Sequence, residues 1–154
     1  MKKSFSLIEL IFVIVIIGIL AAVAVPRLFA TRVDAQIAKA RADISTIRSA
    51  ISNFYTTNLI KGVDSYPQTL DEAQKNVEGQ KLFEGNRTKG EILLDYPIYS
   101  KNANGHWMKI GDTNYTIRIM DTDVKFDYNN ETGAFDCNGI NTNKADDICK
   151  QLTH

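Results

Sequence analysis

The sequence has little of what metal centres and active sites require. Its 154 residues include two cysteines, two histidines and one tryptophan. Neither His106 nor His154 stands at zinc-ligand spacing from the cysteines. Phosphate loops, nucleophile elbows and HExxH helices are also missing. We therefore predict a protein that is not an enzyme, with no catalytic residue, no metal and no cofactor.

The sequence also lacks an excess of charge of either sign. Eighteen basic and eighteen acidic residues give a formal net charge of zero. A nucleic-acid surface needs a basic excess, so no nucleic-acid partner is expected. A chain of this length that is 44% hydrophobic predicts one modest domain plus an N-terminal segment.

One stretch is almost free of charge. Residues 5–25 read FSLIELIFVIVIIGILAAVAV and carry a single charged side chain, Glu9. The 17 residues from Leu10 to Pro26 have no charged or amide side chain. As a helix they would be about 25 Å long, at the short end of what spans a bilayer. We therefore predict a membrane-spanning helix over residues 5–26.

Two other interpretations of this stretch compete with a membrane span. Lys2, Lys3 and the small residues Ala22-Val23-Ala24 fit a cleaved signal peptide, but Glu9 interrupts its apolar region and helical sequence continues past Ala24. A buried core helix is disfavoured because so small a chain has too little other apolar sequence to cover it.

The residues around Glu9 form a recognisable motif. The run Ser4-Phe5-Ser6-Leu7-Ile8-Glu9-Leu10 follows two lysines and leads into an apolar segment that ends at Pro26. It resembles the N-terminus of the type IV pilin and type II secretion pseudopilin superfamily, over about residues 1–55. The resemblance implies that a prepilin peptidase removes residues 1–4, cutting between Ser4 and Phe5, and methylates the new Phe5 amine. Ser4 stands where the family normally has Gly.

The position of Glu9 within the apolar segment also indicates a function on physical grounds. A charged side chain inside a bilayer costs about 2.5 to 3.5 kcal/mol, so it is usually paired or functional. After cleavage, Phe5 would carry a cationic amine at the same depth, and Glu9 of a neighbouring copy would neutralise it. We predict that Glu9 is the assembly residue. The alternative is that its carboxylate extends to the nearby interface.

The orientation of the span is decided by the resemblance. The Lys/Arg count around the span would place its C-terminal side in the cytoplasm. Cys137 and Cys149 instead suggest an exported disulfide, with buried free cysteines as the alternative. Because pilins keep their N-terminus in the cytoplasm, we predict a single-pass inner-membrane protein whose C-terminal domain is periplasmic.

The helix is expected to continue past the membrane. Gly18 and Pro26 predict a kink, and residues 27–60 an amphipathic half that ends near Asn58. Apolar residues recur there at helical spacing: Val33, Ile37, Ala40, Ile44, Ile47, Ile51 and Phe54. We expect this stripe to pack on the chain's own sheet; a coiled coil is the competing interpretation.

Residues 61–154 are predicted to form the globular part. Tyr66-Pro67 opens a turn and a short helix with Thr69 or Asp71 as N-cap, and Gly79–Gly90 is an exposed loop. Antiparallel strands are expected at three segments, and residues 92–98 are either a strand or a short helix. The three segments are Tyr115–Met120, Val124–Tyr128 and Ala134–Cys137. The predicted fold class is α+β and pilin-like: a long helix packed on a small antiparallel sheet, with a disulfide-closed tail.

Two further features are interpreted as structural. Trp107 is expected in the core or as a loop anchor. The aspartates at 121, 123, 127, 146 and 147 are interpreted as solvated turn carboxylates, because no calcium-loop spacing is present.

Together these patterns predict a structural filament subunit. A type II secretion pseudopilus that supports protein export is favoured, because the globular part is small and Tyr66-Pro67 turns occur in secretion pseudopilins. The alternatives are a type IV pilus pilin for adhesion, motility or DNA uptake, and a membrane-anchored periplasmic domain that does not polymerise. The implied partners are other copies, related minor pilins or pseudopilins, prepilin peptidase, and an inner-membrane platform with a cytoplasmic ATPase.

Overall fold

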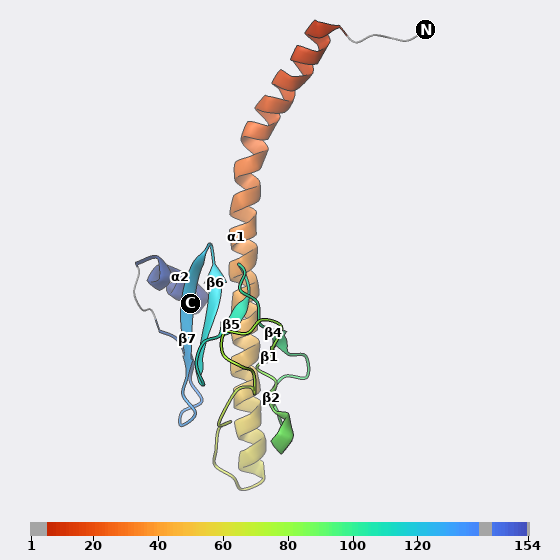
Figure 1. Ribbon diagram of the computed structural model, residues 1–154. Coiled ribbons are helices and arrows are strands. Elements are labelled where there is room, and N and C mark those ends of the chain that lie inside the picture. The colour runs from red at the N-terminus through yellow and green to blue at the C-terminus, as the bar shows by residue number, and fades with distance from the viewer. Residues whose placement is uncertain (1–5, 139–142, 154) are drawn as a thin grey trace. The chain divides into compact units, whose positions relative to one another are not determined.

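A computed structural model of the chain describes residues 6–138 and 143–153, with the side chains of 26–30 left aside. It confirms the α+β class: a long N-terminal helix is followed by small antiparallel sheets and a C-terminal helix (Figure 1). The chain divides into two compact units, residues 1–35 and 36–154, which we describe separately. The second unit is called the head below.

The long helix α1 spans Leu7–Ile60, 54 residues, two past the predicted end. It ends in a Schellman motif: Val63 N–H donates to Asn58 O at 2.9 Å, and Gly62 N–H to Leu59 O at 3.0 Å. Gly62 has a φ of 79°, which glycine adopts without a steric penalty.

The head contains a four-stranded antiparallel sheet of order β5-β6-β7-β8. The strands are β5 (Trp107–Lys109), β6 (Asn114–Ile119), β7 (Thr122–Tyr128) and β8 (Phe135–Cys137). Their register pairs Ile117 with Trp107 on one side and with Val124 on the other, and Tyr128 with Phe135. Buried residues alternate along β6 and β7, so one face of the sheet is apolar. The three predicted strands are confirmed, and Trp107 lies in the core on an edge strand.

The segment between helix and sheet differs from the prediction. No helix follows Pro67, although Asp71 Oδ1 accepts from Ala73 N–H at 3.1 Å as an N-cap would. The backbone of this segment binds other parts of the head instead: Leu70 O accepts from Gly85 N–H, and Asn76 N–H donates to Lys109 O. Gly79–Gly90 is not an exposed loop throughout, since Leu82 and Phe83 are buried. The segment forms two-residue strands and one 3-10 turn: β1 (Lys81–Leu82), β2 (Gly85–Asn86), η1 (Arg87–Lys89), β3 (Glu91–Ile92) and β4 (Ile98–Tyr99).

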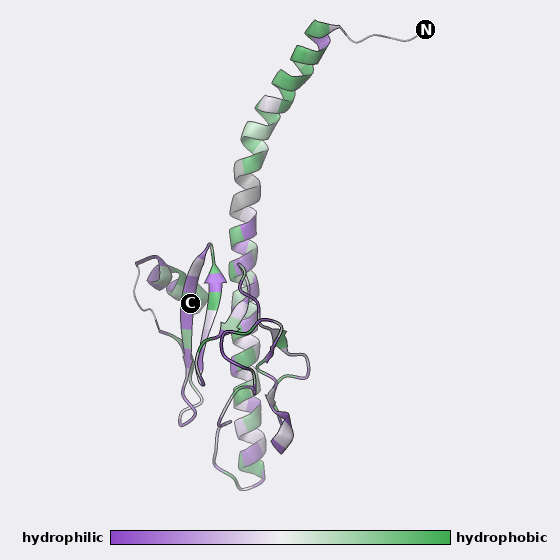
Figure 2. Cartoon of the chain, in the orientation of Figure 1, coloured by the Kyte–Doolittle hydropathy of each residue, from purple (hydrophilic) through white to green (hydrophobic). Residues whose placement is uncertain are grey.

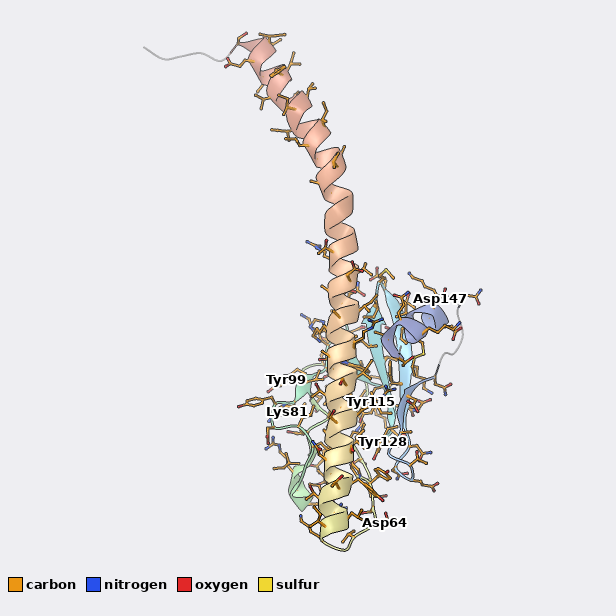
Figure 3. The ribbon with its side chains drawn as sticks, turned by 180° about the vertical axis from the view of Figure 1, so that it is seen from behind. Asp64, Lys81, Tyr99, Tyr115, Tyr128 and Asp147 are labelled. Carbon is orange, nitrogen blue, oxygen red and sulfur yellow. A yellow bond between two sulfur atoms is a disulfide. The ribbon has the colours of Figure 1, made fainter. Side chains whose placement is uncertain are left out.

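These short strands pair locally into two antiparallel ribbons, β1 with β4 and β2 with β3. Residues 92–98 therefore begin and end in strands, with a turn between them. Lys81 and Tyr99 pair across the β1–β4 ribbon, and Figure 3 shows both at its outer side.

The core of the head lies between α1 and the apolar face of the sheet. Ala40, Ile44, Ile47 and Ile51 are buried there with the inward residues of β5 to β8, and Ile37 is partly buried against them. The predicted stripe thus packs on the chain's own sheet from Ile37 to Ile51, while its end residues, Val33 and Phe54, lie outside this core. Aromatic rings pack against one another on the apolar face of the sheet; Trp107 and Phe126, for example, have ring centroids 5.2 Å apart.

The C-terminal helix α2 spans Asn143–Thr153 and was not predicted. Its buried face consists of Ala145, Ile148, Cys149 and Leu152, at helical spacing. Cys149 is bonded to Cys137 at the end of β8, which confirms the predicted disulfide. The bond fixes α2 to the edge of the sheet.

Candidate functional site

The N-terminal part of α1 is an apolar surface that none of the described residues covers. Leu7–Val25, 19 residues, is long and apolar enough to cross a membrane, and none of it is buried. Figure 2 shows this segment mostly in the green of hydrophobic residues. Apolar surface of this extent does not stay in contact with water in a soluble protein. Its length and composition fit a membrane anchor.

Glu9 is the one charged residue of this surface, and it lies in the first turn of α1. Ser6 precedes the helix, and its carbonyl accepts from Glu9 N–H at 3.1 Å and from Leu10 N–H at 3.2 Å. A carboxylate in the first turn interacts favourably with the helix dipole and so stabilises the helix. Within residues 6–138 and 143–153, the Glu9 carboxylate has no ion pair or side-chain hydrogen bond, so it remains available to a cation from outside.

The other residues predicted for this region are only partly described. Ser4 and Phe5, the predicted cleavage and methylation site, lie outside the described residues. α1 runs as an α-helix through Gly18 and Pro26. A Cβ added at Gly18 would meet no atom within 4 Å. Whether the two residues produce a kink stays a prediction.

In the head, charged residues of α1 bind the sheet and the turn before it. Asp43 Oδ2 accepts from Lys39 Nζ at 3.0 Å and from the Trp107 indole N–H at 3.1 Å. Lys39 also donates to Gly105 O at 2.9 Å. This network fixes the β5 end of the sheet against the helix.

Two arginines of α1 hold the opposite side of the head. Arg48 donates to Phe135 O at 3.0 Å and pairs with Asp136 at 2.9 Å, so it covers the outer edge of β8. Arg41 donates to Gln151 O at 2.6 Å, in the last turn of α2. A cation that binds carbonyls at a helix C-terminus stabilises that terminus. Polar side chains of α1 therefore bind both sides of the head: the region of β5 on one side, and β8 with α2 on the other.

A buried polar cluster fixes the segment after α1. Asp71 accepts from Lys109 Nζ at 2.7 Å, from the Tyr115 hydroxyl at 2.9 Å and from Phe83 N–H at 3.0 Å. The Asp71 and Lys109 side chains are 0% and 6% exposed. Burial, and then the Asp71 carboxylate, raise the pKa of Tyr115, which Figure 3 labels on β6. No pattern in the sequence signals this cluster, because its members are far apart in the chain.

Three of the aspartates considered for calcium, at 123, 127 and 146, each have partners of their own. Asp123 pairs with Arg118 at 2.7 Å, and Asp146 with Lys150 at 2.9 Å. Burial alone would raise the pKa of Asp127, but hydrogen bonds from Asn138 and Asn114 and the nearby Lys125 outweigh it and lower that pKa. Among the described residues, no group of three or more His, Cys, Asp or Glu is placed to hold a metal ion.

Comparison with known proteins points to the same N-terminal segment. Residues 1–25 match the family model described as the prokaryotic N-terminal methylation motif. This match contains Ser4, Phe5 and Glu9. No solved structure matched the chain.

Two relatives from Thermus thermophilus extend the similarity into the head. The chain is 30% identical to the type IV wide pilus major component PilA4 over 132 residues, 86% of this chain and 90% of that relative. It is 43% identical to the type IV narrow pilus major component PilA5 over 77 residues, 50% of this chain and 61% of that relative. The first similarity covers helix and head together, so it concerns the whole architecture.

Proposed function

The chain belongs to the type IV pilin family, and we propose that it is a filament-forming structural subunit of a type IV pilus. Membership of this family implies assembly with other pilins and processing by a prepilin peptidase. The observation that carries the proposal is the apolar helix Leu7–Val25, which no described residue covers and which has a single acid, Glu9, in its first turn. A surface of this kind suits lipid and then the helices of other copies.

The names of the relatives support the pilus over the secretion pseudopilus that the sequence suggested. Both are major components of type IV pili. A pseudopilus would use the same N-terminal helix, so the helix alone favours neither branch. The similarity to PilA4 continues through the head, and we take it as the stronger argument for a pilus.

In the proposed mechanism the bilayer stores the subunit. The peptidase cuts before Phe5, the apolar helix keeps the subunit in the inner membrane, and the head lies in the periplasm. Assembly moves the helix from lipid into a bundle of like helices. Because lipid is already apolar, this transfer gains little from the hydrophobic effect, and packing and polar contacts must select the partner. We assign that selection to the pair between Glu9 and the Phe5 amine of the next copy.

Gly18 and Pro26 would act in the same transfer. Both weaken a helix, by about 1 and about 3 kcal/mol relative to alanine in a helix interior. A weak segment between them can bend or unwind as copies pack together. The energy for extraction from the membrane would come from a cytoplasmic ATPase acting through an inner-membrane platform.

Mass spectrometry of the N-terminus tests the processing step. We expect a chain that begins at methylated Phe5. An intact Met1 would indicate an unprocessed anchor that does not polymerise, and a chain beginning at Val25 would indicate an ordinary secreted protein; either result would refute the proposal.

Replacing Glu9 tests the assembly step. Glu9→Val should insert into the membrane at normal levels but form no filaments, because the Phe5 amine of the neighbouring copy loses its counter-charge. Glu131→Val removes an acid from the exposed turn between β7 and β8 and should assemble normally. Filaments of normal length and number from Glu9→Val cells would show that the Glu9 carboxylate does not select the partner during assembly.

Deletion of the gene separates the two filament types. We expect loss of surface pili, seen by electron microscopy, while exported enzymes still reach the medium. Loss of protein secretion with pili intact would assign the chain to a secretion pseudopilus. A position beside genes for a secretin and an assembly ATPase fits both, so the phenotype decides.

A further inference from the structure

The head carries three Asn-x-Thr sequences whose roles the filament does not explain. They begin at Asn86, Asn114 and Asn130. Asn-x-Ser/Thr is the acceptor pattern for N-glycosylation, which occurs on surface loops of exported domains. The pattern is short and arises by chance, so the structure has to decide which of the three is accessible.

The structure argues against two of them. Asn114 lies in β6, between β5 and β7, and its Nδ2 donates to Asp127. Asn130 lies in the turn between β7 and β8, and its Nδ2 donates to Gln68 at 3.2 Å. That turn is closed by Asn129, which accepts from the Glu131 and Thr132 N–H groups. In both sequences the nucleophilic nitrogen already donates a hydrogen bond.

Asn86 is placed differently. It ends β2 and caps η1, and these elements with β3 form a small hairpin whose tip is the 3-10 turn. The base of the hairpin is fixed: Gly85 N–H donates to Leu70 O at 2.9 Å, and Leu93 N–H to Glu84 O at 3.1 Å. Beyond Asn86, residues 87–90 are all exposed. Asn86 therefore lies at the boundary between the hydrogen-bonded base of the hairpin and its exposed tip.

The amide of Asn86 has its oxygen bound and its nitrogen free. Oδ1 accepts from Lys89 N–H at 2.9 Å, which orients the amide. Across the described residues, Nδ2 of Asn86 donates no hydrogen bond. Of the three acceptor sequences, this one alone combines an exposed turn with an unengaged amide nitrogen.

The neighbours of Asn86 supply a recognition pattern. Glu84, two residues earlier, pairs with Arg87 at 2.7 Å. Thr88, two residues later, has an exposed hydroxyl that donates to Glu72 at 3.1 Å. The exposed contact of Thr88 is weak, so an enzyme can replace it with its own. A carboxylate before the acceptor and a hydroxyl after it give such an enzyme two polar groups to bind.

We propose that Asn86 is an N-glycosylation site. The Nδ2 atom attacks the anomeric carbon of an oligosaccharide carried on a lipid pyrophosphate. The new C–N bond forms as the C–O bond to pyrophosphate breaks; the lipid pyrophosphate leaves with that electron pair, and one Nδ2 proton passes to a carboxylate of the transferase. The proposal rests on the periplasmic head of the proposed function, since the acceptor must be outside the cytoplasm.

The test is mass spectrometry of the protein purified from the cells that make it. Trypsin cuts after Lys81 and Arg87 and releases the peptide Leu82–Arg87, which contains Asn86. We expect this peptide to carry a sugar mass and to yield sugar fragment ions. The N-terminal peptide from the same digest reports processing at Phe5 independently, so a failure of the proposed function is distinguishable from a failure of glycosylation.

Matched variants locate the site. Asn86→Asp keeps the oxygen that caps η1 but lacks Nδ2, so the head should fold normally and lose the sugar mass. Thr88→Ala should also lose it, Thr88→Ser should keep it, and Glu84→Gln should lower the modified fraction. Asn114→Gln and Asn130→Gln should change nothing. A Leu82–Arg87 peptide that is wholly unmodified in processed protein, or a sugar on Asn114 or Asn130 instead, would overturn the proposal.

Discussion

Lys109 Nζ lies 2.7 Å from Asp71 Oδ1, in an ion pair enclosed by the head. Lys109 is on the edge strand β5, and Asp71 belongs to the segment that follows α1, 38 positions earlier. The Asp71 carboxylate also binds Tyr115, so one acid joins the irregular segment to two strands. This pair holds together a part of the head that has little regular secondary structure.

Removing Lys109 should therefore destabilise the head strongly. Lys109→Met leaves the Asp71 carboxylate buried without a cation, which typically costs about 3 to 5 kcal/mol. Thermal unfolding of the full chain in detergent, followed through Trp107, would measure the loss. Lys75→Met removes the exposed pair with Asp112 and serves as control; it should barely change the transition. Equal midpoints for the two variants would show that burial adds nothing to the pair.

Breaking the disulfide should free α2 from the sheet. A loop of this size constrains the unfolded chain by about 3 kcal/mol, so reduction of Cys137–Cys149 should lower the unfolding midpoint by several degrees. Protease sensitivity of residues 143–153 should rise in parallel. The double variant Cys137→Ala and Cys149→Ala should unfold like the reduced protein and should not respond to reductant. If reductant also lowered the unfolding midpoint of that variant, the effect of reductant on the parent protein could not be assigned to the disulfide.

Acid should weaken the head partly through Asp127. Its pKa in the folded protein is lowered from an ordinary value of 3.8, because hydrogen bonds from Asn138 and Asn114 and the nearby Lys125 outweigh burial. A lowered folded-state pKa contributes stability that is present above the unfolded value and is lost as pH falls through the folded value. The unfolding midpoint of Asp127→Asn should therefore fall less steeply than that of the parent protein as the pH drops below 3.8. Unfolding midpoints measured from neutral pH downward test this, and parallel curves would contradict it.

Stiffening the apolar helix should affect assembly and not folding. Gly18→Ala meets no neighbouring atom and raises helix propensity by about 1 kcal/mol. Head stability and membrane insertion should stay unchanged, while pilus number falls if the helix must bend or unwind during packing. Ala21→Gly is the opposite change one turn later. Normal piliation of the Gly18→Ala strain would remove Gly18 from the assembly step.

The elements that the sequence determined are those with a regular pattern. Uninterrupted apolar residues define the first part of α1, a spacing of three and four defines its second part, and alternation defines β6 and β7. These patterns depend only on the geometry of one helix or strand, so no contact has to be known. Glu9 is conspicuous for the same reason, because it is the one charge in an apolar run. The helix α2 obeys the same rule through its four buried residues, but it is short and mostly polar, and it was not predicted.

Only the tertiary structure decided the features that depend on distant residues. Asp71 looks like a helix cap in the sequence, yet the ammonium group of Lys109 and the donors of Tyr115 and Phe83 make its carboxylate a buried anchor. Strands of two residues, such as β2 and β3, are too short to show a period. The three Asn-x-Thr sequences look equivalent in the sequence, but contacts within the described residues bind the amide nitrogens of Asn114 and Asn130 and not that of Asn86. In each case the deciding interaction joins parts of the chain that the sequence separates.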